Sequence, residues 1–276
     1  MAQRLFAHLE AVEAFLAPGN PLAALFDFDG TLASLKRWPI EAQLSPLTRS
    51  LLTRLGGLPG VHLGILSGRG REDLRGRVGI ADIYYGSCHG LEIEGPGLTF
   101  QHPEAAEMRP FLSQMARDLR AQSQMFPGAL VEDKGLCVSL HYRNVDRGSV
   151  SFLQDQFFRV LEGYGEKMEA IPGKEVLEAR PRLSWNKGDA VLLLLDHLRQ
   201  KEGERPIALY LGDDQTDEDA FVALRERGLS ICVGADHPTA ARYFLQDLRE
   251  VQRLLGWMSS CRGRRRSAPH LSPPLP

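Results

Sequence analysis

Two aspartates, separated by one residue, follow an apolar segment near the start of this chain. Residues 22–26 read LAALF, and they are followed by Asp27, Asp29, Gly30 and Thr31. A continuous apolar run of this length favours a strand buried on both faces of a parallel sheet, and such sheets bind ligands at the carboxyl ends of their strands. Neighbouring carboxylates resist ionising together, and a hard cation such as Mg²⁺ removes that conflict. Alone, the pattern also fits a strand that ends in an ordinary turn at Gly30.

Other polar residues follow other apolar runs at corresponding points. After residues 61–66 and 207–211, and at the start of a helical pattern, the chain carries Ser67, Arg69, Asp213, Asp214, Asp217 and Lys187. Because the carboxyl ends of neighbouring parallel strands meet, we expect these groups to converge. Carboxylates for a cation, a hydroxyl and a guanidinium for phosphate oxygens, and an ammonium for charge balance suit phosphoryl transfer. Taken singly, Asp213 or Asp214 also suits a helix cap, and Lys187 a surface lysine.

The elements that must hold these groups alternate between strand and helix. The apolar runs predict strands over 22–26, 61–66, 83–85, 207–211 and 230–233. Helical patterns predict helices over 46–55, from residue 72, over 187–200 and over 216–227. Ser45 is the expected N-cap of the first helix. Thr216 and Glu218 or Asp219 are expected to supply oxygens to the first turn of the last helix. This alternation predicts an α/β fold with a Rossmann-like parallel sheet and right-handed crossovers.

The segment 103–182 has a different pattern. Helical patterns over 104–124 and 147–164 alternate with period-two runs over 129–135, 136–144, 168–173 and 174–181. Period-two alternation predicts half-exposed antiparallel strands, with a turn at or near Lys134–Gly135. We therefore predict an α+β insertion at 103–182, between core segments 1–102 and 183–258, and a disordered, basic and proline-rich tail at 259–276.

Composition excludes several classes of protein. The chain has 276 residues, 43% of them hydrophobic and 25% charged, and a formal net charge of −2, which favours neither nucleic acid nor membrane partners. The four cysteines form no CxxC pair, so zinc-finger and thioredoxin-like sites are excluded. Residues 1–20 predict an amphipathic helix rather than a signal peptide, and no apolar stretch reaches the roughly 20 residues of a membrane span. We expect a cytoplasmic protein whose RGRRR tail segment is solvated rather than bound to nucleic acid.

The motifs also carry a resemblance. The order DxDGT, Ser67, Lys187 and GDD resembles the haloacid dehalogenase superfamily of aspartate-nucleophile phosphatases. Further motifs are similar to the trehalose-6-phosphate phosphatase family, namely SGR at 67–69, GSCHG at 86–90, VEDK at 131–134, HYR at 141–143, GKEVLEARP at 173–181, NKG at 186–188 and GDDQTDEDAF at 212–221. The resemblance extends from about residue 22 to residue 245. It implies a haloacid dehalogenase core with an inserted α+β cap of the C2 type.

The resemblance implies roles for the core residues. Asp27 would attack phosphorus, Asp29 would act as general acid and base, and Lys187 would pair with Asp27 and the phosphate. Phosphate binding is implied for Gly30, Thr31, Ser67, Gly68 and Arg69. Mg²⁺ would be held by Asp27, the main-chain carbonyl of Asp29 and Asp213, with Asp214 and Asp217 orienting waters or Lys187.

In the cap, the resemblance implies sugar contacts for Glu132, Lys134, Arg143, Lys174 and Glu178. Glu132 and Lys134 share one face of a strand, and their spacing alone also fits an exposed ion pair. The sequence leaves His89 open, either as a hydrogen-bonded loop residue or as part of the cleft.

The implied activity is Mg²⁺-dependent hydrolysis of trehalose 6-phosphate through an aspartyl-phosphate. Alternatives with the same chemistry are glucosylglycerol phosphate, mannosylglycerate phosphate and sucrose phosphate, and a third is a non-catalytic sugar-phosphate sensor. No glycosyltransferase-sized segment precedes the motifs, so we expect action on preformed sugar phosphate only. The sequence leaves the oligomeric state open and favours a monomer.

Overall fold

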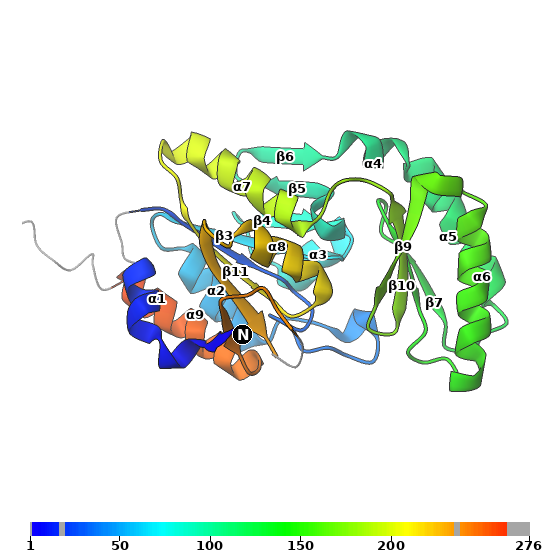
Figure 1. Ribbon diagram of the computed structural model, residues 1–276, viewed down its shortest axis with the longest axis horizontal. Helices are drawn as coiled ribbons and strands as arrows, with labels where there is room; N and C mark the ends of the chain where they lie inside the picture. Colours follow the sequence, from blue (N-terminus) through cyan, green and yellow to red (C-terminus); the bar gives the residue numbers. More distant parts are fainter. Residues whose placement is uncertain (1, 17–19, 235–237, 264–276) are drawn as a thin grey trace, which may run out of the picture.

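We describe the protein from a computed structural model that covers residues 2–16, 20–234 and 238–263 (Figure 1). In these residues the strands form two sheets, one of nine strands and one of four. Within the same residues, none of the helices has both the length and the apolar character needed to cross a membrane.

The large sheet follows the order β1-β13-β12-β11-β2-β3-β4-β5-β6. Its strands are β1 (Gln3–Arg4), β13 (Tyr243–Leu245), β12 (Gly228–Val233), β11 (Ile207–Gly212), β2 (Leu22–Phe26), β3 (Val61–Leu66), β4 (Tyr84–Ser87), β5 (Glu92–Gly95) and β6 (Leu98–Gln101). Pairing is parallel from β1 to β4 and antiparallel from β4 to β6. Strand β2 lies in the middle, with Phe26 opposite both Leu211 of β11 and Ile65 of β3.

Helices cover both faces of this sheet. Every residue of β2 is buried, with Leu22, Ala24 and Phe26 in one apolar cluster and Ala23 and Leu25 in another. The first cluster includes side chains of α1 (Leu9–Phe15), α2 (Pro46–Gly56), α3 (Arg71–Val78) and α9 (Leu248–Gly263). The second includes side chains of α7 (Lys187–Glu202) and α8 (Glu218–Ala223). The uninterrupted apolar run that predicted β2 thus reflects burial on both faces.

The small sheet is antiparallel throughout, in the order β7-β8-β10-β9. Its strands are β7 (Leu130–Asp133), β8 (Val138–His141), β10 (Val176–Pro181) and β9 (Met168–Gly173). Figure 1 shows α5 (Arg109–Ser123) and α6 (Val150–Glu162) along its side away from the large sheet, where they form a separate apolar core. The helix α4 (Pro103–Glu107) precedes this unit.

Register places three polar residues of the small sheet side by side. Ser139 of β8 lies opposite Glu132 of β7 on one side and opposite Glu178 of β10 on the other. Paired residues of neighbouring strands point to the same face, so these side chains share the face that is not covered by α5 and α6. All three line the cavity described below.

Several boundaries differ from the sequence prediction. The helix predicted over 1–20 is replaced, in the described residues, by β1, a short 3₁₀ turn and α1. The helix predicted over 104–124 is two helices that meet at Met108, where Pro110 occupies the first turn of α5 and has no N–H to continue the ladder from α4. Residues 92–101 form an antiparallel hairpin that the prediction omitted.

The carboxyl-terminal part was also predicted incompletely. The helix predicted over 216–227 begins as a 3₁₀ turn at Gln215–Asp217 and ends with α8 at Ala223. Its first cap is Asp214, not Thr216, because the Asp214 carboxylate accepts the Thr216 N–H. Helix α9 continues to Gly263 and buries Ser259, so disorder from residue 259 is wrong for residues 259–263. The rest of that predicted tail lies outside the described residues.

Candidate active site

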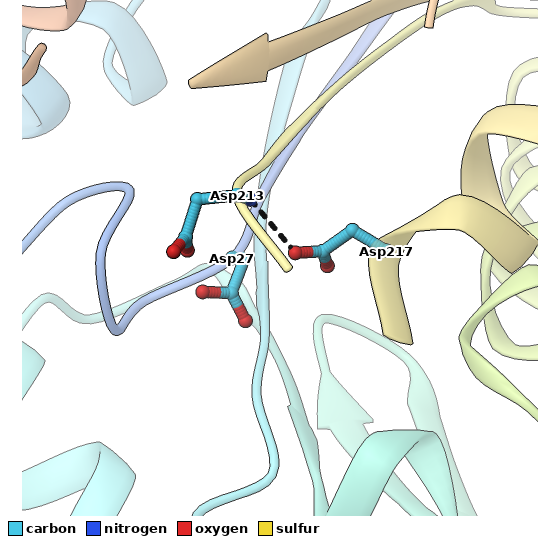
Figure 2. Close-up of side chains that lie close together, drawn as sticks. All are labelled: Asp27, Asp213 and Asp217. Atoms are coloured by element: carbon cyan, nitrogen blue, oxygen red, sulfur yellow. Dashed lines mark hydrogen bonds between the residues drawn. The ribbon is translucent and has the colours of Figure 1, made fainter. Parts of the chain in front are cut away.

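The polar residues predicted to converge do meet at the carboxyl edge of the large sheet. Asp27 follows β2, and Asp213 follows β11, the neighbouring strand. One oxygen from each of Asp27, Asp213 and Asp217 can be chosen so that all lie within 4.8 Å of one another (Figure 2). All three residues are buried. The parallel register of β2 and β11 therefore produces a buried acidic cluster from residues almost two hundred positions apart.

Lys187 balances two members of this cluster. Its Nζ donates to Asp27 Oδ1 and to Asp217 Oδ1, each at 2.7 Å, and its side chain is 1% exposed. Asn186 caps α7 with its side chain and fixes the first turn in which Lys187 lies. The two carboxylates raise the pKa of Lys187 well above its usual value, although burial acts to lower it. Lys187 is thus a buried ammonium rather than a surface lysine.

Each carboxylate oxygen of Asp217 already accepts two hydrogen bonds, which leaves neither oxygen for a metal ion. Its Oδ1 accepts from Lys187 and from the Tyr210 hydroxyl at 2.7 Å, and its Oδ2 accepts from the backbone N–H groups of Asp213 at 2.9 Å and Asp214 at 3.1 Å. Figure 2 shows the bond from the Asp213 backbone. Asp217 therefore orients Lys187 and the turn that presents Asp213.

Asp213 is held at the edge of the cavity. Its carboxylate accepts from the Thr31 hydroxyl at 3.2 Å and lies 3.4 Å from the exposed Lys174 ammonium. Gly30 has a φ of 88°, and a Cβ there would lie 2.1 Å from Asp213 Oδ2, so only glycine lets this carboxylate approach the loop after β2. Burial, with the charges of Asp217 and Asp214, raises the pKa of Asp213 to about 7.

These carboxylates fit a hard divalent cation. Burial raises the pKa of Asp27 well above its usual value even though Lys187 opposes that rise, and Asp213 is raised as well. A cation between them would restore the ionised form of both, and oxygen ligands are those that hard divalent ions prefer. Of the three acids, Asp27 and Asp213 have oxygens to offer, whereas Asp217 is saturated. Asp214 lines the same cavity, and Lys187 and the bonds from Thr216 lower its pKa to about 2 against the effect of burial.

Asp29 forms a bidentate ion pair with Arg69. The guanidinium donates to both Asp29 oxygens, at 2.7 and 2.8 Å, and also to Asp73 Oδ2 at 2.6 Å. Its carbon lies 5.3 Å from the centre of the Phe28 ring. Arg69 was predicted to bind phosphate, and in the structure it is hydrogen-bonded to the carboxylates of Asp29 and Asp73.

The other predicted phosphate residues divide into two groups. Ser67 and Gly68 line the cavity together with Arg69, and the buried Ser67 Oγ accepts the Arg69 N–H at 3.2 Å. Thr31 is fully buried and supports Asp213, while Gly30 provides the close approach described above. The first group can contact a ligand directly, and the second positions a carboxylate that can.

In the small sheet, Glu178 is the centre of a charged network. Its Oε2 accepts from Lys134 Nζ at 2.7 Å and from the Ser139 hydroxyl at 2.9 Å, and its Oε1 lies 2.9 Å from Nε2 of His89. Lys134 and His89 lower the pKa of Glu178 well below its usual value, against the effect of burial. His89 belongs to the large-sheet unit, so this contact joins the two units and assigns His89 to the cleft.

His89 has a strained backbone and little space around it. Its φ is 58°, in the left-handed region, and a Cβ on Gly68 would lie 2.7 Å from its ring. The cleft assignment could not be reached from the sequence, because it depends on a contact between units. The sequence analysis also did not identify Ser139 and Tyr210 as site residues, although both lie within predicted strands.

The remaining predicted sugar-contacting residues lie on the same cleft. Glu132 Oε2 lies 3.1 Å from His141 Nε2, and the hydrogen-bonded partner of Lys134 is Glu178. Arg143 bonds Glu175 at 2.7 Å, the Lys174 carbonyl at 2.9 Å and the Lys36 carbonyl, and Asn144 bonds Arg37. The small-sheet unit thus rests on the loop after β2, and a cavity of about 740 Å³ lies between them.

A family model for trehalose-phosphatase matches residues 25–249. The probable trehalose-phosphate phosphatase H of Arabidopsis thaliana is 34% identical over 261 residues, which is 88% of this chain and 74% of that protein. The trehalose-phosphate phosphatase of Mycobacterium tuberculosis is 37% identical over 234 residues, 83% of this chain and 59% of that protein. The chain therefore spans about three fifths to three quarters of the lengths of these relatives.

Solved structures agree with the sequence relatives. The C-terminal domain of trehalose-6-phosphate phosphatase from C. albicans has a TM-score of 0.80 and 25% identity, covering 94% of this chain and 99% of that one. A haloacid dehalogenase-like hydrolase from Bacteroides thetaiotaomicron has a TM-score of 0.58 at 17% identity, covers 87% of this chain and 99% of that one, and shows the fold alone. The predicted fold class, a parallel-sheet core with a cap, is confirmed. The chain belongs to the trehalose-phosphatase family.

Proposed function

We propose that this chain is a Mg²⁺-dependent phosphatase that hydrolyses trehalose 6-phosphate to trehalose and phosphate. The observation that carries the proposal is the buried Asp27–Lys187 pair at the floor of a cavity roofed by hydrogen-bonding side chains. The cavity, about 740 Å³, is in the range that holds a ligand of disaccharide size. The names of the relatives give the substrate class.

Asp27 is the nucleophile in this proposal. One carboxylate oxygen attacks phosphorus, the bond from phosphorus to the sugar oxygen breaks, and an aspartyl-phosphate forms. Lys187 donates to Oδ1 of Asp27, which leaves Oδ2 for attack and favours the ionised form. Water then attacks phosphorus, the bond from phosphorus to the Asp27 oxygen breaks, and free phosphate and the Asp27 carboxylate result.

Asp29 moves the protons. It protonates the departing sugar oxygen in the first step and takes a proton from the attacking water in the second. Arg69 holds the Asp29 carboxylate in place through both of its oxygens. Arg69 lines the cavity with Ser67 and Gly68, so these three residues can contact the phosphate directly, while Thr31 supports Asp213.

The cation would be held by Asp27, the main-chain carbonyl of Asp29 and Asp213. When bound, Mg²⁺ supplies charge neutralisation between the nucleophile and the phosphate oxygens. Asp217 positions Lys187 and the Asp213 backbone, and Asp214 caps the turn that follows.

The cap residues Glu132, Lys134, Arg143, Lys174 and Glu178 are proposed to bind sugar hydroxyls. Glu178 and Lys134 already satisfy each other, so they present oriented donors and acceptors rather than an uncompensated charge to a neutral sugar. A cytoplasmic location and a monomer remain predictions.

The test is phosphate release from a panel of sugar phosphates, with Mg²⁺ and with chelator, by the purified chain. We expect the highest kcat/KM on trehalose 6-phosphate, and no turnover by Asp27→Asn, which is nearly isosteric. A higher kcat/KM on glucosylglycerol, mannosylglycerate or sucrose phosphate would keep the chemistry and overturn the substrate. A folded wild type without turnover on any member would favour a sensor.

A further inference from the structure

One aromatic side chain borders the cavity on the loop that follows the catalytic aspartates. Trp38 is partly buried and lines the cavity, and among the described residues of its lining it is the one with a Phe, Tyr or Trp side chain. Its neighbours in the loop, Lys36 and Arg37, line the cavity too. The rest of the wall is charged and polar groups with smaller apolar side chains such as Ile171 and Pro172. Trp38 therefore offers the one broad, flat apolar surface in that lining.

The loop fixes Trp38 relative to Asp29. The N–H of Trp38 donates to Glu41 Oε2 at 3.1 Å, and its carbonyl accepts the Glu41 N–H at 3.0 Å. The carbonyl of the next residue, Pro39, accepts from Arg69 Nη2 at 2.9 Å. That same nitrogen donates to Asp29 Oδ1. The Arg69 guanidinium therefore links Asp29, the proposed proton donor, to the Pro39 carbonyl next to Trp38.

The cap holds the other side of the same loop. Arg143 donates to the Lys36 carbonyl, and the side chains of Arg37 and Asn144 are hydrogen-bonded. The two residues before Trp38 therefore contact the cap, and the residue after it contacts the core. The backbone that carries the indole is therefore held from both sides, by the core and by the cap.

We propose that Trp38 is a specificity-determining residue whose indole face stacks on a pyranose ring of the leaving sugar. The proposal rests on the function proposed above and adds to it the surface that distinguishes a disaccharide phosphate from the phosphate of a small polyol. A pyranose presents hydroxyl groups at its edge and C–H groups on its face, and those C–H groups suit the negative face of an aromatic ring. The cap network binds the hydroxyl edge, and Trp38 covers the apolar face.

Trp38 could instead be a packing residue of the loop, and substitutions separate the two roles. Trp38→Phe keeps an aromatic face, Trp38→Leu keeps an apolar side chain without one, and Trp38→Ala removes both. Ile40→Ala is the matched control, because Ile40 belongs to the same loop, is 72% exposed and lies outside the cavity lining.

The experiment measures kcat/KM on trehalose 6-phosphate and on glycerol 3-phosphate for wild type and these four variants. We expect Trp38→Ala and Trp38→Leu each to lose about tenfold on trehalose 6-phosphate, Trp38→Phe to lose about threefold, and the losses on glycerol 3-phosphate to be much smaller. Ile40→Ala should match wild type. Equal losses on both substrates, or a Trp38→Leu variant as active as Trp38→Phe, would overturn stacking.

A binding readout supports the same distinction without turnover. In an Asp27→Asn background, trehalose 6-phosphate should change the intrinsic tryptophan fluorescence, and Trp38→Phe should abolish that change although Trp185 and Trp257 remain. An unaltered fluorescence change in Trp38→Phe would contradict the proposal. If wild type hydrolyses another sugar phosphate best, the substrate assignment fails, and the same variants tested with that sugar phosphate decide the role of Trp38 separately.

Discussion

The two buried carboxylate clusters of this protein are balanced in opposite ways. In the core, Asp27, Asp213 and Asp217 are served mainly by one buried ammonium, that of Lys187, and burial raises the pKa of each acid. In the cap, Glu178 accepts from Lys134, Ser139 and His89, and its pKa is lowered. The core cluster has one buried ammonium for three acids and is suited to a further cation, whereas the partners of Glu178 already satisfy it and the cap is suited to a neutral ligand.

The two lysines differ in the same way. Lys187 is shared by two core acids, and Lys134 belongs to one cap acid. The Lys187 side chain is 1% exposed and that of Lys134 9%, so each is expected to matter for stability. Of the two, Lys187 is the one that touches Asp27, the proposed nucleophile.

Removal of divalent metal should affect the core cluster alone. With chelator present, we expect a loss of kcat/KM of more than about a thousandfold on trehalose 6-phosphate and on glycerol 3-phosphate equally. Steady-state kinetics in chelator, followed by Mg²⁺ addition, measure the loss and its reversal. A residual activity above a tenth of the wild-type value would contradict a cation at Asp27 and Asp213.

The matched substitutions Lys187→Met and Lys134→Met compare the two ammonium groups. Lys187→Met should lose roughly a thousandfold on both substrates, because Asp27 loses its partner. Lys134→Met should lose about a hundredfold on trehalose 6-phosphate and far less on glycerol 3-phosphate. Denaturant unfolding should show that each variant is destabilised by about 3 kcal/mol, since a buried carboxylate loses its ammonium partner. The same substrate pattern in both variants would erase the proposed distinction.

Glu178→Gln tests the cap network with little change in shape. We expect a loss of about thirtyfold on trehalose 6-phosphate, because Lys134 loses its counter-charge and turns away from the sugar. Glu169→Gln is the control, since Glu169 is paired with Arg180 on the same sheet but lies outside the cavity lining. Kinetics on both substrates check the result, and equal losses on the two esters would remove Glu178 from the sugar site.

The smallest expected effect is a pH dependence of the metal-free protein. Asp213 has a pKa of about 7, above the unfolded value of about 3.9, so the folded state favours the protonated acid. Its contribution to stability is present below about pH 4 and is lost as the pH rises toward 7. In chelator, wild type should lose more stability than Asp213→Asn as the pH rises over this interval. Parallel pH profiles of unfolding would contradict this assignment.

The core was largely predictable from sequence, and the cap contacts were not. The run Leu22–Phe26 predicts a doubly buried strand, and Asp27 necessarily follows it, so the edge position of the acids comes from local pattern and parallel pairing. The three-residue strand Tyr243–Leu245 escaped prediction because its existence depends on pairing with β12. His89 reaches Glu178 only through a left-handed backbone and the closeness of two units, which no local pattern encodes.

The central claim is that the carboxyl group of Asp27 is transiently phosphorylated. The most direct test is a rapid acid quench of the enzyme with trehalose 6-phosphate labelled in the phosphate, followed by peptide mapping of the labelled protein. The account predicts an acid-stable, base-labile label on the peptide that contains Asp27, formed before free phosphate and absent in Asp27→Asn. Turnover of trehalose 6-phosphate with no label on that peptide at any time would contradict it.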